Sequence, residues 1–370
     1  MSKSEILTLA AAAIVAGSFL ISLVLTGLVS VLAPRAGFVS RPVKDRFSQR
    51  TIPLGGGIAI FTTLMTVILT TAAAIKFLPG KLDLFAETAN INPADFLGKI
   101  NELVIILLSV LVLFVLGLWD DKRKLGPFIK LAVQFIVAII AAALAEIRIE
   151  FFIENKIITS ALSAVWIVLI INAFNFLDNM DGLSAGIAVI AGSILFTAAA
   201  TSGQVFVGGL ALVLIGSLLG FLVFNFPPAK IFMGDAGSLV VGFLVALLTL
   251  RTTYYHEAES GQWYPVLMPL VVMAVPLYDF ISVTILRISQ GRSPFVGDTQ
   301  HFSHRLKSHG LTDTQTVLAL YLATLCTGLG ATFLYQVNLA GAILTFIQTF
   351  MILAIIAILE TTMKNDRTAD

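Results

Sequence analysis

Charged residues and cysteine are scarce in this sequence. Only 12% of its 370 residues are Asp, Glu, Lys or Arg, against 58% that are hydrophobic, whereas a soluble domain carries about 25% charged residues. The single cysteine, Cys326, excludes an internal disulfide and a cysteine-rich metal site. A formal net charge of +1 argues against a nucleic acid partner. No Gly-x-x-x-x-Gly-Lys-Ser/Thr loop occurs, so ATP hydrolysis is not indicated.

Long apolar runs are abundant instead, and they recur along the whole chain. Each is long enough to cross a bilayer as a helix. We therefore predict an all-α, polytopic membrane protein that forms one integral-membrane domain over residues 1–370. Pro269 and Pro276 predict a kink or break in the ninth span. About eleven spans are expected, near residues 6–33, 54–78, 103–119, 127–145, 160–176, 183–201, 205–225, 237–253, 264–286, 315–336 and 339–362.

The basic residues predict the orientation of these spans. Of the 23 Lys and Arg residues, 16 fall in one set of loops, which the positive-inside rule places in the cytoplasm. The N-terminus is then expected outside and the C-terminus in the cytoplasm. The polar motifs all fall on the cytoplasmic side, in segments near 34–53, 119–130, 172–182, 225–238 and 287–314.

One polar cluster interrupts the apolar pattern at the end of the fifth span. Asn172, Asn175, Asp178 and Asp181 stand at every third position. A 3₁₀ turn would set all four on one face, whereas an α-helix would fan them around its circumference. Polar groups at this depth are costly and favour a functional site. The alternative is a hydrogen-bonding patch between helices that ends in a turn.

Two further carboxylate motifs lie on the same side. Asp120 and Asp121 end the third span, and Lys130 opens the fourth. Adjacent carboxylates repel each other unless a cation or base lies between them, so we predict that the pair positions Mg²⁺ or Lys130. Asp235 lies in a glycine-rich turn and is a candidate metal ligand, since Mg²⁺ prefers oxygen ligands that it shares with phosphates. The structural alternatives are a charged helix end and a helix N-cap.

Basic segments flank these motifs. A basic stretch at 41–50 leads into Pro53-Leu-Gly-Gly-Gly57, whose glycines would let backbone N–H groups approach an anion; ordinary positive-inside charge before a turn is the alternative. His301 and Arg305 lie in the most polar segment, which suits a phosphate or sugar better than zinc. Asp279, inside the ninth span, is expected only to pair with a neighbour. Together, Mg²⁺-type ligands and basic residues beside apolar helices suggest transfer between a nucleotide diphosphate and a lipid phosphate.

Five of these motifs, in this order over about residues 40–310, resemble those of the polyprenyl-phosphate N-acetylhexosamine-1-phosphate transferases, the glycosyltransferase 4 family of MraY, WecA and TagO. The motifs that carry the resemblance are Pro53-Leu-Gly-Gly-Gly57, Asp120-Asp121, Asn-x-x-Asn-x-x-Asp-x-x-Asp-Gly at 172–182, Phe232-Met-Gly-Asp-x-Gly-Ser238, and Ser293-Pro-Phe295 followed by His301 and His304.

The resemblance implies a membrane enzyme that transfers a sugar 1-phosphate, expected to be N-acetylglucosamine 1-phosphate, from a UDP-sugar to undecaprenyl phosphate. It also implies release of UMP, Mg²⁺ (or Mn²⁺) as cofactor, a site facing the cytoplasm from the plasma membrane, and a product used for cell-envelope polysaccharide. Whether the enzyme is a homodimer is left open.

The resemblance also implies roles for individual residues. Asp235 and Asn175 would hold the metal, and Lys130 would contact the diphosphate. Asn225, Phe232 and Asp181 would line the nucleoside pocket. The complete set of predicted catalytic residues is Asp120, Asp121, Asp178, Asp235 and Lys130, and the remaining predicted substrate-binding residues are Asn172, His301, His304 and Arg305.

The sequence departs from the family pattern at three motifs. Arg-Lys-x-His becomes Asp45-Arg-Phe-Ser48, Asp-Gly-x-Asp-Gly becomes Asp178-Asn-Met-Asp-Gly182, and His-x-His-His becomes His301-Phe-Ser-His304. The Ser-Pro-Phe loop favours the WecA and TagO branch. The alternatives are an MraY-like phospho-N-acetylmuramoyl-pentapeptide transferase and, from another class, a lipid or solute transporter, which would place its site on broken helices near the membrane midplane.

Overall fold

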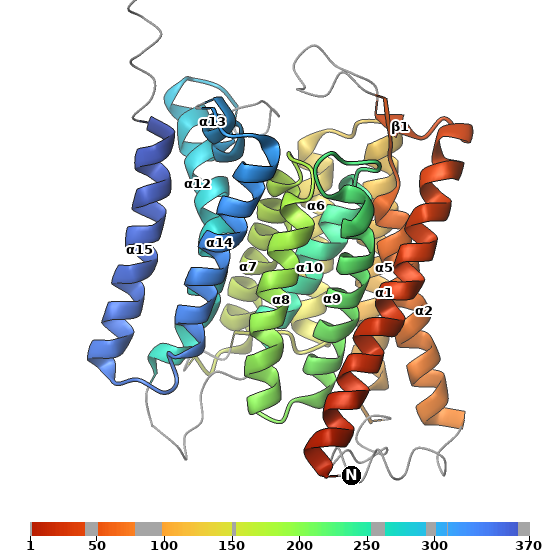
Figure 1. Cartoon of the computed structure of the whole chain (residues 1–370). Coiled ribbons are helices and arrows are strands. Elements are labelled where there is room, and N and C mark those ends of the chain that lie inside the picture. The colour runs from red at the N-terminus through yellow and green to blue at the C-terminus, as the bar shows by residue number, and fades with distance from the viewer. Residues whose placement is uncertain are drawn as a thin grey trace, which may run out of the picture.

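The computed structural model is a bundle of long helices (Figure 1). It describes residues 2–40, 51–77, 98–149, 153–252, 263–293, 301–308 and 310–361; for residues 3, 304, 308 and 361 only the backbone is described. The predicted basic stretch at 41–50 and the Ser-Pro-Phe loop beyond Ser293 therefore lie outside the described residues.

Every predicted span coincides with helical structure. The long helices are α1 (Lys3–Arg35), α2 (Gly56–Phe77), α5 (Ile100–Lys122), α6 (Pro127–Leu144), α7 (Lys156–Leu177), α8 (Leu183–Thr201), α9 (Val205–Asn225), α10 (Asp235–Arg251), α12 (Ala274–Ser289), α14 (Asp313–Thr332) and α15 (Leu339–Thr361). The short elements are β1 (Val39–Ser40), β2 (Ile52–Pro53), the 3₁₀ helix η1 (Tyr264–Leu267), α11 (Met268–Val272) and α13 (Phe302–Ser308).

Nine of the described helices are long and apolar enough to cross a membrane, and a tenth is added if the bent pair of the ninth span counts as one. The pair bends by 65° between Val272 and Ala274, which confirms the predicted kink or break in the ninth span. Helix α10, with 17 residues, is shorter than each of these nine helices. The structure thus confirms a polytopic helical protein, and the number of eleven spans stays a prediction.

Helix α10 is the centre of the bundle. Every residue from Ala236 to Thr249 is buried, and the helix packs against α2, α5, α7 and α8. Glycines allow this close approach: a side chain on Gly57 of α2 or Gly117 of α5 would collide with the backbone at the start of α10. The first turn of α10, which Asp235 opens, is therefore packed tightly against α2 and α5.

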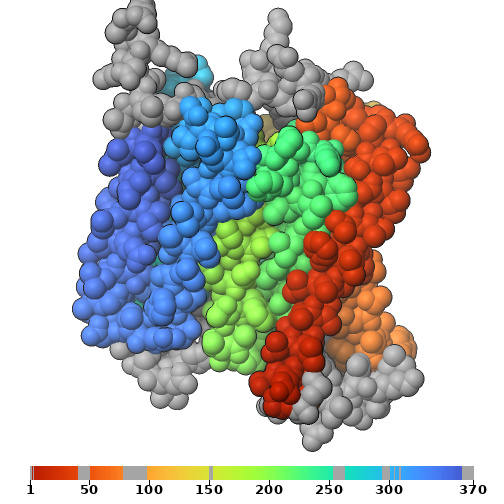
Figure 2. Space-filling view, in the orientation of Figure 1, coloured from red at the N-terminus to blue at the C-terminus, as the bar shows by residue number. Residues whose placement is uncertain are grey.

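The outer surface of the bundle is apolar. On the face shown in Figure 2, α1 runs obliquely past α9, and α14 and α15 form the opposite side. More than half of the surface of Leu28 on α1 and of Phe350 and Ile358 on α15 is exposed. Such all-round apolar helices suit a lipid environment.

The motifs gather at one end of the bundle, which is the upper end in Figure 1. Strand β1, helix α13 and the connection from α9 to α10 all lie there, and so does the end of α15. Helix α1 begins at the opposite end. The segments predicted as loops are partly helical, since 119–122 belongs to α5, 172–177 to α7 and 235–238 to α10.

Candidate active site

Lys130, in the first turn of α6, joins two carboxylates from different helices. Its ammonium group donates to Oδ2 of Asp120 at 3.0 Å and to Oδ2 of Asp235. Oδ1 of Asp120 accepts the backbone N–H of Leu125 at 2.6 Å, which fixes the turn between α5 and α6. The contact predicted between the aspartate pair and Lys130 is thus made by Asp120. The three side chains are only 14–26% exposed, so water screens their charges weakly.

Asp121 has a different position from its neighbour. Its Oδ1 accepts the N–H of Asp235 at 2.9 Å, and its Oδ2 accepts the N–H of Ala236 at 3.1 Å. These are two of the unpaired N–H groups at the start of α10. The N-cap residue itself is Gly234, with φ of 72°, and has no side chain to serve them. Asp121 therefore caps α10 from another helix, and Asp235 is not the cap that the sequence offered as an alternative.

The glycine motif packs directly against the segment that leads into α10. Gly56 N–H donates to the carbonyl of Phe232, and Gly57 N–H donates to that of Met233, both at 2.9 Å. The N–H of Phe232 donates in return to the carbonyl of Pro53 at 2.9 Å. The N–H groups of Gly56 and Gly57 are thus engaged by the protein rather than offered to an anion, and the motif positions the predicted nucleoside-binding Phe232.

The polar cluster at the end of α7 lies partly in an α-helix, and its two asparagines contact different helices. Asn172 donates to the side-chain oxygen of Gln134 on α6 at 2.7 Å. Asn175 donates to the hydroxyl of Ser238, in the first turn of α10, at 2.9 Å. Helix α7 ends at Leu177, and Asp178 is its C-cap. Asn175 is therefore the member of this cluster that packs beside the turn carrying Asp235.

Asp181 and Asn225 brace the connection between α9 and α10. Oδ2 of Asp181 accepts the N–H of Ala229 at 2.8 Å. Asn225 accepts the N–H of Gly182 at 3.0 Å and donates to the carbonyl of Ile231 at 2.9 Å. Burial raises the pKa of the Asp181 carboxyl above its ordinary value. The predicted nucleoside-binding residues Asp181 and Asn225 are thus hydrogen-bonded to the connection between α9 and α10.

His301 contacts two residues that the sequence analysis did not assign to the site. Its Nδ1 lies 2.9 Å from Oδ2 of Asp279 on α12, and Asp279 is completely buried. The ring of Phe176 contacts the His301 ring edge-on, with centroids 5.4 Å apart. The guanidinium of Arg287 lies over the same phenyl ring at 5.1 Å. A lone carboxylate inside an apolar span was the only sequence signal for Asp279.

Arg305 is bound to the last helix rather than exposed at the site. Its guanidinium donates to Oε2 of Glu360 on α15 at 2.9 Å and to the hydroxyl of Ser282 at 3.2 Å. Oε1 of Glu360 accepts the hydroxyl of Tyr278 at 2.6 Å. The phosphate-binding role of Arg305 stays a prediction. The backbone of His304 lies in α13, and its side chain is outside the described residues.

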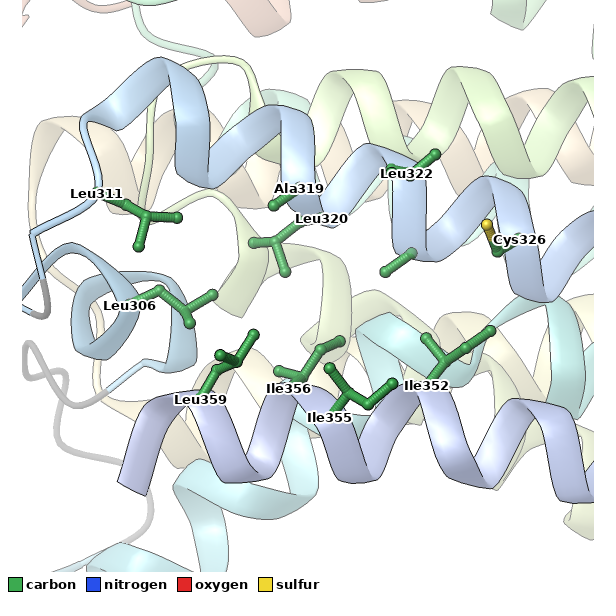
Figure 3. A pocket seen from close by; sticks show the side chains of 11 residues that line it. Leu306, Leu311, Ala319, Leu320, Leu322, Cys326, Ile352, Ile355, Ile356 and Leu359 are labelled. Atoms are coloured by element: carbon green, nitrogen blue, oxygen red, sulfur yellow. The ribbon is translucent and has the colours of Figure 1, made fainter. Parts of the chain in front are cut away.

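An apolar cavity of about 300 Å³ lies beside α13, between α14 and α15 (Figure 3). The described residues that line it are Leu, Ile, Ala and Cys. The lining residues are Leu306, Leu311, Ala319, Leu320, Leu322, Ala323, Cys326, Ile352, Ile355, Ile356 and Leu359.

The polar cluster contains oxygen donors of the kind that a magnesium ion takes. Within the described segments no three His, Cys, Asp or Glu side chains gather as a metal-ligand group. Two carboxylates, Asp120 and Asp235, nevertheless hold a cation between them in the form of the Lys130 ammonium. Mg²⁺ is usually held by one or two carboxylates and completes its coordination with phosphates and water. The oxygen donors of Asp235 and Asn175 match that requirement.

Comparison with known proteins gives the family. Residues 103–253 match glycosyl transferase family 4. The chain is 32% identical over 313 residues to the probable undecaprenyl-phosphate N-acetylglucosaminyl 1-phosphate transferase of Bacillus subtilis, covering 82% of this chain and 79% of that protein.

Two further relatives are each 28% identical to this chain. They are the decaprenyl-phosphate N-acetylglucosaminephosphotransferase of Mycobacterium leprae, matched over 86% of this chain and 83% of its own, and the undecaprenyl-phosphate alpha-N-acetylglucosaminyl 1-phosphate transferase of Salmonella typhi, matched over 86% and 82%. The chain therefore belongs to glycosyl transferase family 4, among the polyprenyl-phosphate N-acetylhexosamine-1-phosphate transferases that its motifs indicated.

Proposed function

We propose that this protein transfers N-acetylglucosamine 1-phosphate from UDP-N-acetylglucosamine to a polyprenyl phosphate and releases UMP. The names of the relatives support the sugar phosphate and the lipid acceptor. The observation that carries the proposal is the Lys130 ammonium between Asp120 and Asp235, at the polar end of an apolar helical bundle. A cation held there by two carboxylates is suited to phosphate groups at the membrane surface.

Lys130 is the residue that we expect to bind the diphosphate. An ammonium group is a compact charge with three donors on a flexible stem, so it can keep Asp120 as a partner and turn a donor toward a phosphate oxygen. Charge-assisted hydrogen bonds of this kind are about twice as strong as neutral ones. Phosphoryl transfer depends mainly on such positioning and on neutralisation of charge, which is the work that these side chains can perform.

Asp235 and Asn175 would hold Mg²⁺ next to Lys130. Asp235 opens α10, and Asn175 is fixed against the first turn of that helix through Ser238. When bound, the metal would neutralise phosphate charge during the transfer. The acceptor needs no general base, because a phosphate monoester with a second pKa near 6 is mostly a dianion at neutral pH.

The apolar cavity is where we place the hydrocarbon chain of the acceptor. Leu306 lines the cavity and follows Arg305 directly on α13, the helix that His301 precedes. Leu359, at the same end, is followed by Glu360, the partner of Arg305. A chain lying between α14 and α15 would thus bring its phosphate to the polar end of the bundle. Burial of apolar chain surface in this cavity would contribute about 25 cal/mol for each Å² removed from water.

We also propose that the polar end faces the cytoplasm from the plasma membrane, because 16 of the 23 basic residues belong to that side. In a Cys326→Ala background, Lys124→Cys should escape a membrane-impermeant thiol reagent in intact cells, whereas Ser4→Cys should react. Both positions are exposed. The reverse pattern would overturn this orientation.

Transfer can be tested directly with purified protein in liposomes that contain undecaprenyl phosphate. A panel of UDP-sugars labelled in the sugar should give label in the lipid phase from UDP-N-acetylglucosamine, with one UMP released for each sugar transferred. Lys130→Met is the matched inactive control. Label that enters the lipid phase with release of UDP, or none at all with every donor, would contradict the proposal.

A further inference from the structure

Asp279 is a buried carboxylate that belongs to none of the five family motifs. It lies in α12 among apolar residues, and its exposed fraction is 0%. Both of its oxygens are engaged: Oδ2 with Nδ1 of His301 at 2.9 Å, and Oδ1 with the N–H of Phe302 at 3.2 Å. Burying a carboxylate is costly unless it is paired and hydrogen-bonded, so these two contacts account for its presence.

The geometry determines which nitrogen of His301 carries a proton. A carboxylate that accepts from Nδ1 selects the ring form with a proton on Nδ1, and Nε2 becomes the nitrogen that faces away from α12. The edge-on contact with Phe176 restricts the ring from a second direction. Phe176 lies between Asn175 and Asp178, on the motif that packs beside α10. The ring of His301 is thus held by two helices, α12 through Asp279 and α7 through Phe176.

We propose that Asp279 is a positioning residue for the transfer reaction. It fixes the orientation of the His301 ring and keeps the proton on Nδ1, so that Nε2 is directed to a phosphate or sugar oxygen of the substrate. The substrate contact of His301 rests on the proposed function. The proton position that Asp279 imposes on the His301 ring does not depend on the proposed function, and it can be measured without turnover.

The competing explanation is that Asp279 only anchors the start of α13 through Phe302. Helix α13 has other anchors, and one of them provides a control: Lys307 near its end pairs with Asp313 of α14 at 2.6 Å. Asp313→Asn would loosen α13 without touching His301. An effect that arises from α13 alone should then appear in both Asp279→Asn and Asp313→Asn.

Nitrogen-15 NMR of histidine-labelled protein in detergent tests the proposal. The chain has only 4 histidines, so the His301 signals can be assigned by their loss in His301→Ala. Nδ1 of His301 should be protonated in the wild type and in Asp313→Asn, and should lose part of its proton to Nε2 in Asp279→Asn. An unchanged proton position in Asp279→Asn would overturn the proposal, whatever reaction the protein catalyses.

Enzyme kinetics provide a second test. The comparison of Asp279→Asn in two backgrounds separates a role through His301 from poor folding of the single variant. Carboxylates that orient histidines typically contribute about 10- to 100-fold to activity at metal sites, and a loss of that size in kcat is expected for Asp279→Asn, with the KM for the UDP-sugar little changed. In a His301→Ala background the same change should cause no further loss, because residues that act as a unit are not additive. An equal loss in both backgrounds would show that Asp279 acts through the fold and not through His301.

Discussion

Asp120 and Asp121 are adjacent and chemically identical, yet the structure predicts that their amide variants differ in stability. Asp121→Asn should destabilise the protein because it removes one acceptor from the two N–H groups that start α10. The asparagine oxygen can serve one of them, while its NH₂ group faces the other. Asp120→Asn should cost less stability, because its oxygen can still accept from Leu125 and the Lys130 ammonium keeps Asp235 as a partner.

The contacts give the size of the difference. A buried N–H donor that is left without a partner costs about 1–3 kcal/mol. Asp121→Asn should therefore lower the free energy of unfolding by about 1–3 kcal/mol. In Asp120→Asn no buried donor loses its last partner, because Lys130 keeps the Asp235 carboxylate and the N–H of Leu125 keeps the amide oxygen, so the expected loss is smaller.

Thermal unfolding in detergent, followed by circular dichroism, measures this difference. We expect a lower melting temperature for Asp121→Asn than for Asp120→Asn, and slower turnover for Asp120→Asn even in fully folded protein. Equal melting temperatures would refute the capping role of Asp121. A larger loss of stability in Asp120→Asn would refute the assignment of the two residues altogether.

Two further variants test the packing and the cavity. Gly117→Ala should destabilise the protein by about 1–3 kcal/mol, because the added methyl group would collide with the backbone at Ala236, whereas Gly126→Ala, which has no neighbour within 4 Å, should be nearly neutral by thermal unfolding. Ala323→Phe should fill the cavity and raise the KM for undecaprenyl phosphate severalfold more than the KM for a short-chain analogue. The control is Leu318→Phe, on the exposed surface of α14. An equal KM change for both acceptors would show that the cavity does not bind the acceptor chain.

Most of the helical architecture could be predicted from the sequence because a transmembrane helix is encoded locally. An apolar run of sufficient length is its own signal, and prolines identified the break in the ninth span. The central position of α10 could not be read in this way. It depends on Gly57 and Gly117 lying against the first turn of a helix more than a hundred residues later, and only the folded chain brings them together.

The contacts of the candidate site could be predicted where a charged residue required an oppositely charged partner. Asp120 needed a cation, and Lys130 lay ten residues away. The different position of Asp121 could not be predicted, because it depends on the backbone N–H groups of α10. Asp279 and Glu360 were missed for a similar reason: their partners, His301 and Arg305, are 22 and 55 residues away, in a segment whose fold has no periodic signal.

The central claim is the transfer of a sugar together with its phosphate, and the fate of the β-phosphate of the donor tests it most directly. UDP-N-acetylglucosamine carrying radioactive phosphorus only in the β-phosphate should be incubated with the purified protein, Mg²⁺ and undecaprenyl phosphate. We predict that the radioactive phosphate enters the lipid phase at the same rate as the sugar, and that Lys130→Met abolishes both. Sugar in the lipid phase with the radioactive phosphate left in soluble UDP would contradict the account.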